Sequence, residues 1–185
     1  YARYRESVDS VLAQIESARP AIAAGADRAR LQELLPAGAA RNAIDCALWD
    51  LEAKQQGIPA FRFVGLAPPS PVTTAFTLSL GTPEDMAAAA RAASQRPLLK
   101  LKLAGSGDVE RLAAVRAAAP LASLIVDANE AWSPADLAIN LEAGAKQGVS
   151  LVEQPLPAGA DAAWAEVPHL APICADESLH DRPIS

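Results

Sequence analysis

Cysteine, histidine and aromatic residues are scarce in this sequence. It contains 2 Cys, 2 His and only 4% aromatic residues among 185. So few cysteines argue against a disulfide framework, and no Cys-x-x-Cys or Cys/His cluster indicates zinc or iron–sulfur chemistry. Cys46 and Cys174 lie within regular apolar patterns. They are predicted to be buried free thiols in a reducing compartment, the cytoplasm.

Excess positive charge and long apolar runs are also missing. The net charge of −6 argues against nucleic acid as a partner, because its phosphates attract basic surfaces. No apolar run is long enough to span a bilayer, and there is no basic amphipathic stretch or secretory signal, so no membrane partner is expected. With 51% hydrophobic and 21% charged residues, the composition is that of a globular protein. The chain begins at Tyr1 rather than Met, and we expect it to lack its natural start.

The first part of the chain has the apolar spacing of helices. Helices are predicted over residues 6–24, 27–35 and 39–56, with Pro20 expected to kink or shorten the first. A proline-rich linker follows, and the rhythm then changes. The predicted domains are residues 1–70, helical with the linker, and residues 71–185.

Strands and helices alternate in the second part. Strands are predicted over residues 73–80, 98–103, 123–127, 149–153 and 172–176, and helices follow each of the first four. The alternation predicts a parallel sheet. Polar residues end the strands at intervals of 25, 26 and 23 residues, from Lys102 through Asp127 and Glu153 to Asp176. This is typical of a (β/α)8 barrel. A doubly wound sheet has a similar rhythm, although the phosphate-binding glycine motifs are absent.

Lys100 and Lys102 alternate with leucines on the second predicted strand. Residues two apart face the same side of a strand, so both lysines point one way and the leucines the other. Inside a barrel each ammonium group disfavours the charge of the other, which would lower the lysine pKa toward the range of a general base. An edge strand with lysines in water explains this segment alone equally well.

Three carboxylates follow the next three apolar runs: Asp127, Glu153 and Asp176. Converging at one barrel mouth, they would repel one another without a cation. Hard oxygen ligands in this number suit Mg2+. A single Asp after a strand is usually a helix cap or a turn residue, but three at matching positions favour a metal site.

Four successive strand motifs resemble those of the enolase superfamily, in family order. They are Lys100-Leu101-Lys102, Val126-Asp127-Ala128-Asn129, Val152-Glu153-Gln154-Pro155 and Cys174-Ala175-Asp176-Glu177-Ser178. The segment around Asp45 and Trp49 also resembles the capping-domain helix of that family. Within the superfamily, Thr77-Leu78-Ser79, the turn at 105–108 and residues 176–182 are most similar to dipeptide epimerases acting on L-Ala-D/L-Glu.

The resemblance implies an α/β fold, a partial TIM (β/α)8 barrel of about five strands preceded by the helical part of an α+β capping domain. It also implies an isomerase that abstracts an α-proton from a dipeptide and forms a metal-stabilised enolate. Asp127, Glu153 and Asp176 would bind Mg2+, Lys102 would be one acid/base, and Lys100 would tune it and contact the substrate carboxylate. Thr77 would contact substrate, and Asn129, Gln154 and Glu177 would lie around the ligands. A homo-oligomer is expected.

The resemblance also indicates what the chain does not contain. In the family a second acid/base lysine lies on the sixth strand and an Asp-x-Asp on the eighth, both beyond Ser185, so we expect a piece that lacks both termini. Residues 71–185 number 115, against about 250 for a typical barrel. The alternatives are another superfamily enzyme, such as a muconate cycloisomerase or o-succinylbenzoate synthase, or an inactive metal-binding half-barrel completed by a second copy.

Overall fold

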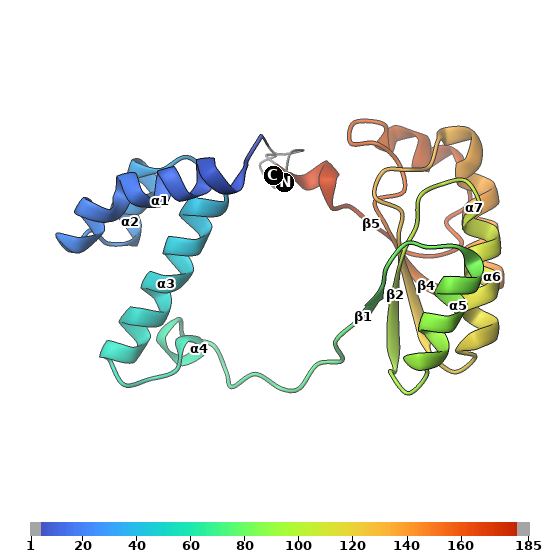
Figure 1. Cartoon of the computed structure of the whole chain (residues 1–185), viewed down its shortest axis with the longest axis horizontal. Helices are drawn as coiled ribbons and strands as arrows, with labels where there is room; N and C mark the ends of the chain where they lie inside the picture. Colours follow the sequence, from blue (N-terminus) through green and yellow to red (C-terminus); the bar gives the residue numbers. More distant parts are fainter. Residues whose placement is uncertain (1–4, 181–185) are drawn as a thin grey trace. The chain divides into compact units, whose positions relative to one another are not determined.

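The computed structural model describes residues 5–180. The chain divides into two compact units, Tyr1–Pro71 and Val72–Ser185, which we call the helical unit and the sheet unit. Residues 66–75, between the last helix of the first and the first strand of the second, form no helix or strand (Figure 1). None of the helices in the described range is both long and apolar enough to cross a membrane.

The helical unit consists of α1 (Val8–Ala23), α2 (Arg28–Leu34), α3 (Ala39–Gln55) and the short α4 (Ala60–Phe63). Ser7 begins α1 with a capping box, in which its hydroxyl accepts from the Ser10 backbone N–H and the Ser10 side chain accepts in return. The helix continues through Pro20 to Ala23, so the proline does not shorten it. The core of the unit is small and is formed by Ala18, Leu31, Leu35, Ala40 and Leu48.

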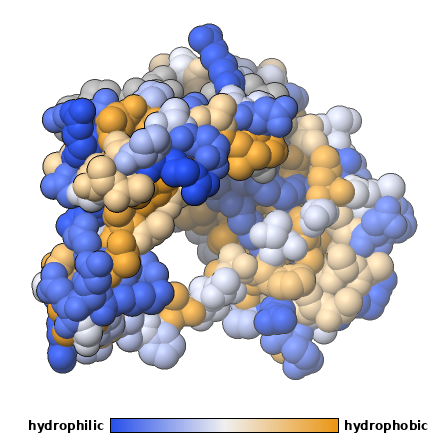
Figure 2. Space-filling view, turned by 60° about the vertical axis from the view of Figure 1, so that its left-hand side comes forward, coloured by the Kyte–Doolittle hydropathy of each residue, from blue (hydrophilic) through white to orange (hydrophobic). Residues whose placement is uncertain are grey.

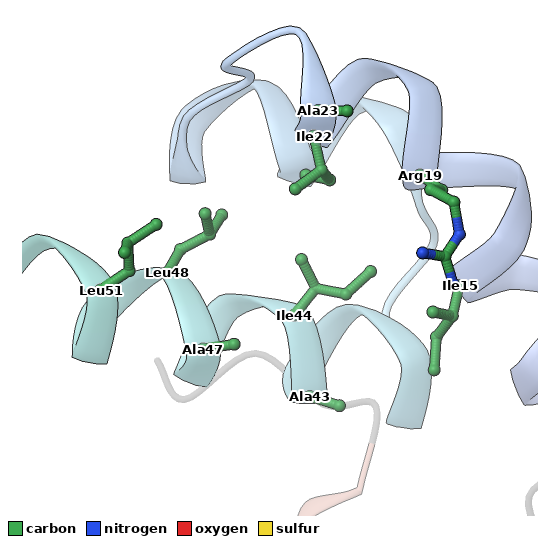
Figure 3. A pocket seen from close by; sticks show the side chains of 9 residues that line it. All are labelled: Ile15, Arg19, Ile22, Ala23, Ala43, Ile44, Ala47, Leu48 and Leu51. Carbon is green, nitrogen blue, oxygen red and sulfur yellow. The ribbon is translucent and has the colours of Figure 1, made fainter.

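A groove opens between α1 and α3. It has a volume of about 460 Å3, and apolar side chains from both helices, with the aliphatic part of Arg19, line it (Figure 3). Ile22 projects from α1 toward Ile44 and Leu48 on α3, and Ile15 lines the groove farther along α1 (Figure 3). The two helices therefore do not close completely over their shared apolar face.

The sheet unit alternates strands and helices. It contains β1 (Phe76–Leu78), α5 (Pro83–Ala92), β2 (Leu98–Lys102), α6 (Asp108–Ala118), β3 (Ser123–Asp127), α7 (Pro134–Lys146), β4 (Val149–Glu153), η2 (Asp161–Glu166), β5 (Ile173–Cys174) and η3 (Glu177–Leu179). The five strands are parallel and lie in the order β1-β2-β3-β4-β5. A doubly wound sheet would reverse direction at a switch point. The uninterrupted order is that of part of a (β/α)8 barrel, which confirms the predicted fold class.

One face of the sheet is covered by α5, α6 and α7 (Figure 1). Leu99, Leu101, Leu124 and Val126 are buried on that face together with Leu112 from α6. Burial of apolar side chains is the main force that holds such a layer together. Lys100 and Lys102 alternate with Leu99 and Leu101 along β2, so this packing turns the lysines to the other face of the sheet.

Both predicted cysteine thiols are free, but both are exposed rather than buried. Cys46 lies on the outer side of α3, and Cys174 lies at the end of the short strand β5. The apolar pattern around each residue was therefore a poor guide to its burial. Figure 2 likewise shows apolar residues at the surface among hydrophilic ones, which is usual for a folded protein.

Candidate active site

The carboxyl ends of β2, β3 and β4 bring charged residues together. Lys102 is in register with Asp127, and Asp127 with Glu153. Along β2, Leu99 and Leu101 are fully buried, while Lys100 and Lys102 are half-buried on the opposite face. The predicted alternation is confirmed, and the lysines face carboxylates rather than open water.

Three short ion pairs join these side chains. Lys102 Nζ lies 2.6 Å from Asp127 Oδ2, and Lys100 Nζ lies 3.0 Å from the same oxygen and 2.6 Å from Glu153 Oε2. The Asp127 side chain is only 1% exposed, whereas those of Lys100 and Lys102 are 20% and 37% exposed. We call Lys100, Lys102, Asp127 and Glu153 the strand-end cluster.

Electrostatics in the strand-end cluster differ from the sequence-based expectation. Burial by itself lowers the pKa of Lys100, but hydrogen bonds to Glu153 and Asp127 and their negative charges outweigh it, so its pKa is raised. The predicted lowering of the lysine pKa is therefore wrong for Lys100. Two carboxylates lie in direct contact with its ammonium group, and their effect outweighs the repulsion from the second lysine. Burial raises the pKa of Asp127, but hydrogen bonds from Lys102 and Lys100 reverse this and leave it lowered.

Gln154 links the end of β4 to the segment after β5. Its side chain is fully buried, and its backbone has a positive φ of 34°. Oε1 accepts hydrogen bonds from the backbone N–H groups of Asp176 and Ser178, and Nε2 donates to Leu156 O and Ser178 Oγ. Every donor and acceptor of the amide is used, so Gln154 fixes where Asp176 leaves the sheet.

Asp176 and Glu177 lie just beyond β5. The Asp176 side chain is exposed, and Oε2 of Glu177 is buried with no hydrogen-bond partner among the described residues. Within residues 5–180, no three Asp, Glu, His or Cys side chains are gathered closely enough to hold a metal ion. The three proposed ligands nevertheless supply hard carboxylate oxygens from three successive strand ends, a donor set that fits Mg2+ in chemistry.

Asn129 and Thr77 occupy the edges of this region. Asn129 has a positive φ of 47° and donates its backbone N–H to Asp127 Oδ1 at 3.1 Å. It thus supports the carboxylate through its backbone rather than its side chain. Thr77 pairs in register with Lys100, so it lies on the same face of the sheet as the lysine.

Sequence reasoning missed two buried polar contributors. Asp108, at the start of α6, accepts a hydrogen bond from Trp132 Nε1 at 2.8 Å. Ser178 contacts both Gln154 and Asp161. An acidic residue in a first helical turn usually indicates only helix-dipole stabilisation, and nothing in the sequence pairs it with a tryptophan 24 residues away.

Comparison with known proteins places the chain in a family. Residues 84–184 match the model of the enolase C-terminal domain-like family. Residues 2–65 match the N-terminal domain of mandelate racemase and muconate lactonizing enzymes. The chain belongs to this family, the enolase superfamily, as its strand-end motifs predicted.

Among curated relatives, the L-Ala-D/L-Glu epimerase of Escherichia coli (strain K12) is 50% identical, over 98% of this chain and 57% of its own length. An N-acetyl-D-glutamate racemase from Pseudoalteromonas is 42% identical, over 97% of this chain and 58% of its own length. The chain therefore spans a little more than half of each relative.

Solved structures of enolase-family proteins are also similar to this chain. An enolase family member from Agrobacterium tumefaciens with homology to dipeptide epimerases, with bound sodium and L-Ala-L-Glu, has a TM-score of 0.91 and 50% identity. The match covers 97% of this chain and 55% of that one. A dipeptide epimerase from Enterococcus faecalis, complexed with Mg and L-Leu-L-Tyr, has a TM-score of 0.80 and 30% identity, over 95% and 53% of the two chains.

Proposed function

We propose that the natural protein containing this chain is a Mg2+-dependent dipeptide epimerase of the L-Ala-D/L-Glu type. The observation that carries the proposal is the strand-end cluster, which sets two lysines against carboxylates in a chain 50% identical to such an epimerase. The reaction inverts the α-carbon by removing its proton from one face and returning a proton on the other.

Lys102 is the better placed of the two lysines to accept the α-proton. Its side chain is 37% exposed and pairs with one carboxylate, whereas Lys100 is 20% exposed and pairs with two. Since the pKa of Lys100 is raised, Lys100 stays protonated and supplies a fixed positive charge. We assign proton transfer to Lys102, and binding of the substrate carboxylate to Lys100 and Thr77.

Asp127, Glu153 and Asp176 would hold the metal ion. Bound there, Mg2+ supplies positive charge that stabilises the anion formed when the α-proton leaves. Asn129 and Gln154 would keep Asp127 and Asp176 in place through the hydrogen bonds described above. Glu177, with its buried unpaired oxygen, would add negative charge beside the metal site.

A second substrate is supported by the relative that racemises N-acetyl-D-glutamate, at 42% identity. Ala-Glu and N-acetylglutamate both contain glutamate with an acylated amino group. Their acyl groups differ, because alanyl carries a free ammonium group and one more carbon than acetyl. The cytoplasmic location and a homo-oligomeric state stay predictions from the sequence.

Proton exchange in D2O tests the proposal. The natural full-length protein is incubated with Mg2+ and L-Ala-L-Glu, and the glutamate α-proton is followed by NMR. We expect the α-proton signal to disappear while L-Ala-D-Glu forms, and chelation of the metal to stop both changes. Exchange of N-acetylglutamate alone would establish the second candidate. Absence of exchange with either substrate, despite tight Mg2+ binding, would contradict the proposal and favour another enzyme of the superfamily or an inactive metal-binding protein.

A further inference from the structure

Asp108 is a buried carboxylate that the proposed chemistry does not use. It is 1% exposed, and four donors point at it. Oδ1 accepts from the Ala104 backbone N–H at 3.1 Å and from Arg111 Nη1 at 3.0 Å. Oδ2 accepts from the Gly105 backbone N–H at 2.7 Å and from Trp132 Nε1 at 2.8 Å. A buried charge needs such partners, so each of these contacts is costly to remove.

Arg111 extends the contacts of Asp108 to two loops. Its Nε donates to Gly81 O at 2.9 Å, in the segment that follows β1, and its Nη1 donates to Ser106 O, in the segment that follows β2. The guanidinium group has several donors in a rigid plane, so one side chain can fix two loops at once. The ion pair with Asp108 holds that plane in place.

Trp132 extends the contacts to two further strand ends. It is 1% exposed, follows β3, and donates its backbone N–H to Pro155 O after β4. The loops after β2 and β3 also touch directly. A Cβ atom added at Gly105, whose φ is +93°, would lie 2.9 Å from Ala131 O. Only glycine fits this approach without a shift.

We propose that Asp108, Arg111 and Trp132 are positioning residues that hold the segments after β1 to β4 in one arrangement, and thereby place Lys102 relative to Asp127. Lys102 lies two residues before Ala104, and Asp127 five before Trp132. The inference rests on the proposed function, because the residues it places are the proposed acid/base and a proposed metal ligand. A misplacement of about 1 Å in such a site can cost about 100-fold in rate.

Two variants test the proposal in the natural full-length protein. Asp108→Asn keeps one acceptor oxygen but turns an NH2 group toward two of the four donors. Trp132→Phe removes only the indole N–H and keeps an aromatic ring. For each variant we expect kcat for epimerisation to fall about 10- to 100-fold, while KM changes less than about threefold. Trp132→Phe keeps the test decisive if Asp108→Asn does not fold.

Glu52→Gln is the matched control. Glu52 forms a bidentate, partly buried pair with Arg28 in the helical unit. Breaking it is expected to lower the thermal midpoint and leave kcat unchanged. A purely structural role for Asp108 would give the same result as the control, namely a lower midpoint with unchanged kcat, and would overturn the inference.

A second readout needs no substrate. The indole N–H of Trp132 is expected to exchange slowly with solvent in the unsubstituted protein and much faster in Asp108→Asn, as followed in 15N-labelled samples. Rapid exchange in the unsubstituted protein would contradict the network itself. Slow exchange of the Trp132 indole N–H, in a protein that does not exchange the substrate α-proton, would support the network and contradict the proposed function. The two failures are therefore distinguishable.

Discussion

The two units of this chain use polar residues differently. In the helical unit the ion pairs of Glu16 with Arg19 and of Asp50 with Lys54 lie at the surface, with side chains at least 61% exposed. In the sheet unit Asp108, Asp127 and Gln154 are buried and hydrogen-bonded. Burial of polar groups costs free energy unless every partner is present. The contrast agrees with the proposal that the active site lies in the sheet unit. In the helical unit the partly buried pair of Arg28 with Glu52 is an exception to the exposed charge.

The largest effect that would test this contrast is loss of the proposed acid/base. Lys102→Ala is expected to lower α-proton exchange about 10²- to 10⁴-fold, because general acid–base catalysis contributes about that much. Exchange in D2O measures the effect. Lys146→Ala, in the last turn of α7, is the matched control and should exchange at the unsubstituted rate. Substantial exchange in Lys102→Ala would move the proton transfer to another residue.

The next effect concerns acid stability. The pKa of Asp127 is lowered in the folded protein, so the group contributes stability above its ordinary pKa of 3.8, and this contribution is lost as pH falls through the folded value. Asp127→Asn does not titrate, so its thermal midpoint should fall less steeply between neutral pH and about pH 3. Midpoints measured across this range by calorimetry check the prediction. Parallel profiles for the two proteins would contradict it.

Asp127→Asn also tests how Lys100 contributes to stability at alkaline pH. Its pKa is raised in the folded protein, so its contribution to stability is present below the ordinary lysine pKa and is lost as pH rises through the folded value. Removal of one of its two carboxylate partners should reduce that alkaline loss. Asp127→Asn is therefore expected to flatten the stability profile at both ends.

The next prediction concerns packing in the core of the helical unit. Leu31 is fully buried in the small core of the helical unit, and Leu31→Ala is expected to destabilise that unit by about 2–5 kcal/mol. Amide hydrogen exchange should then rise in α2 and α3 and stay unchanged in β2 to β4. Increased exchange throughout the sheet unit would show that the two units are energetically coupled.

The smallest expected effect is at the surface. Lys54→Ala removes the pair with Asp50, whose side chains are 73% and 63% exposed, and should change stability by about 0.5 kcal/mol or less. Denaturant titration measures this change. A loss as large as that of Leu31→Ala would contradict the view that this exposed ion pair contributes little to stability.

Sequence patterns predicted the central strands well and the edges poorly. β3 and β4 begin and end where predicted. In β3, Leu124 and Val126 are buried and Ile125 between them is partly buried. The predicted strands over 73–80 and 172–176 shorten to Phe76–Leu78 and Ile173–Cys174. Each of these strands pairs on one side only, and pairing, which limits strand length, is a tertiary property that a local pattern does not contain.

The site was predictable where side chains alternate along one strand. Lys100 and Lys102 face the carboxylates because two-residue periodicity fixes their side. The pKa of Lys100 and the contacts of Asp108 were not predictable, because they depend on distances between residues from different strands and loops. Tertiary packing sets these distances, and they cannot be read from the spacing of residues along the sequence.

The most direct test of the proposed metal site is a crystal structure of the natural protein with Mn2+ in place of Mg2+, in which the anomalous signal locates the metal. We expect one peak at the strand ends, coordinated by carboxylate oxygens of Asp127, Glu153 and Asp176. A peak held by other residues, or none at these three despite measured metal binding, would contradict the claim that the strand-end cluster is the active site.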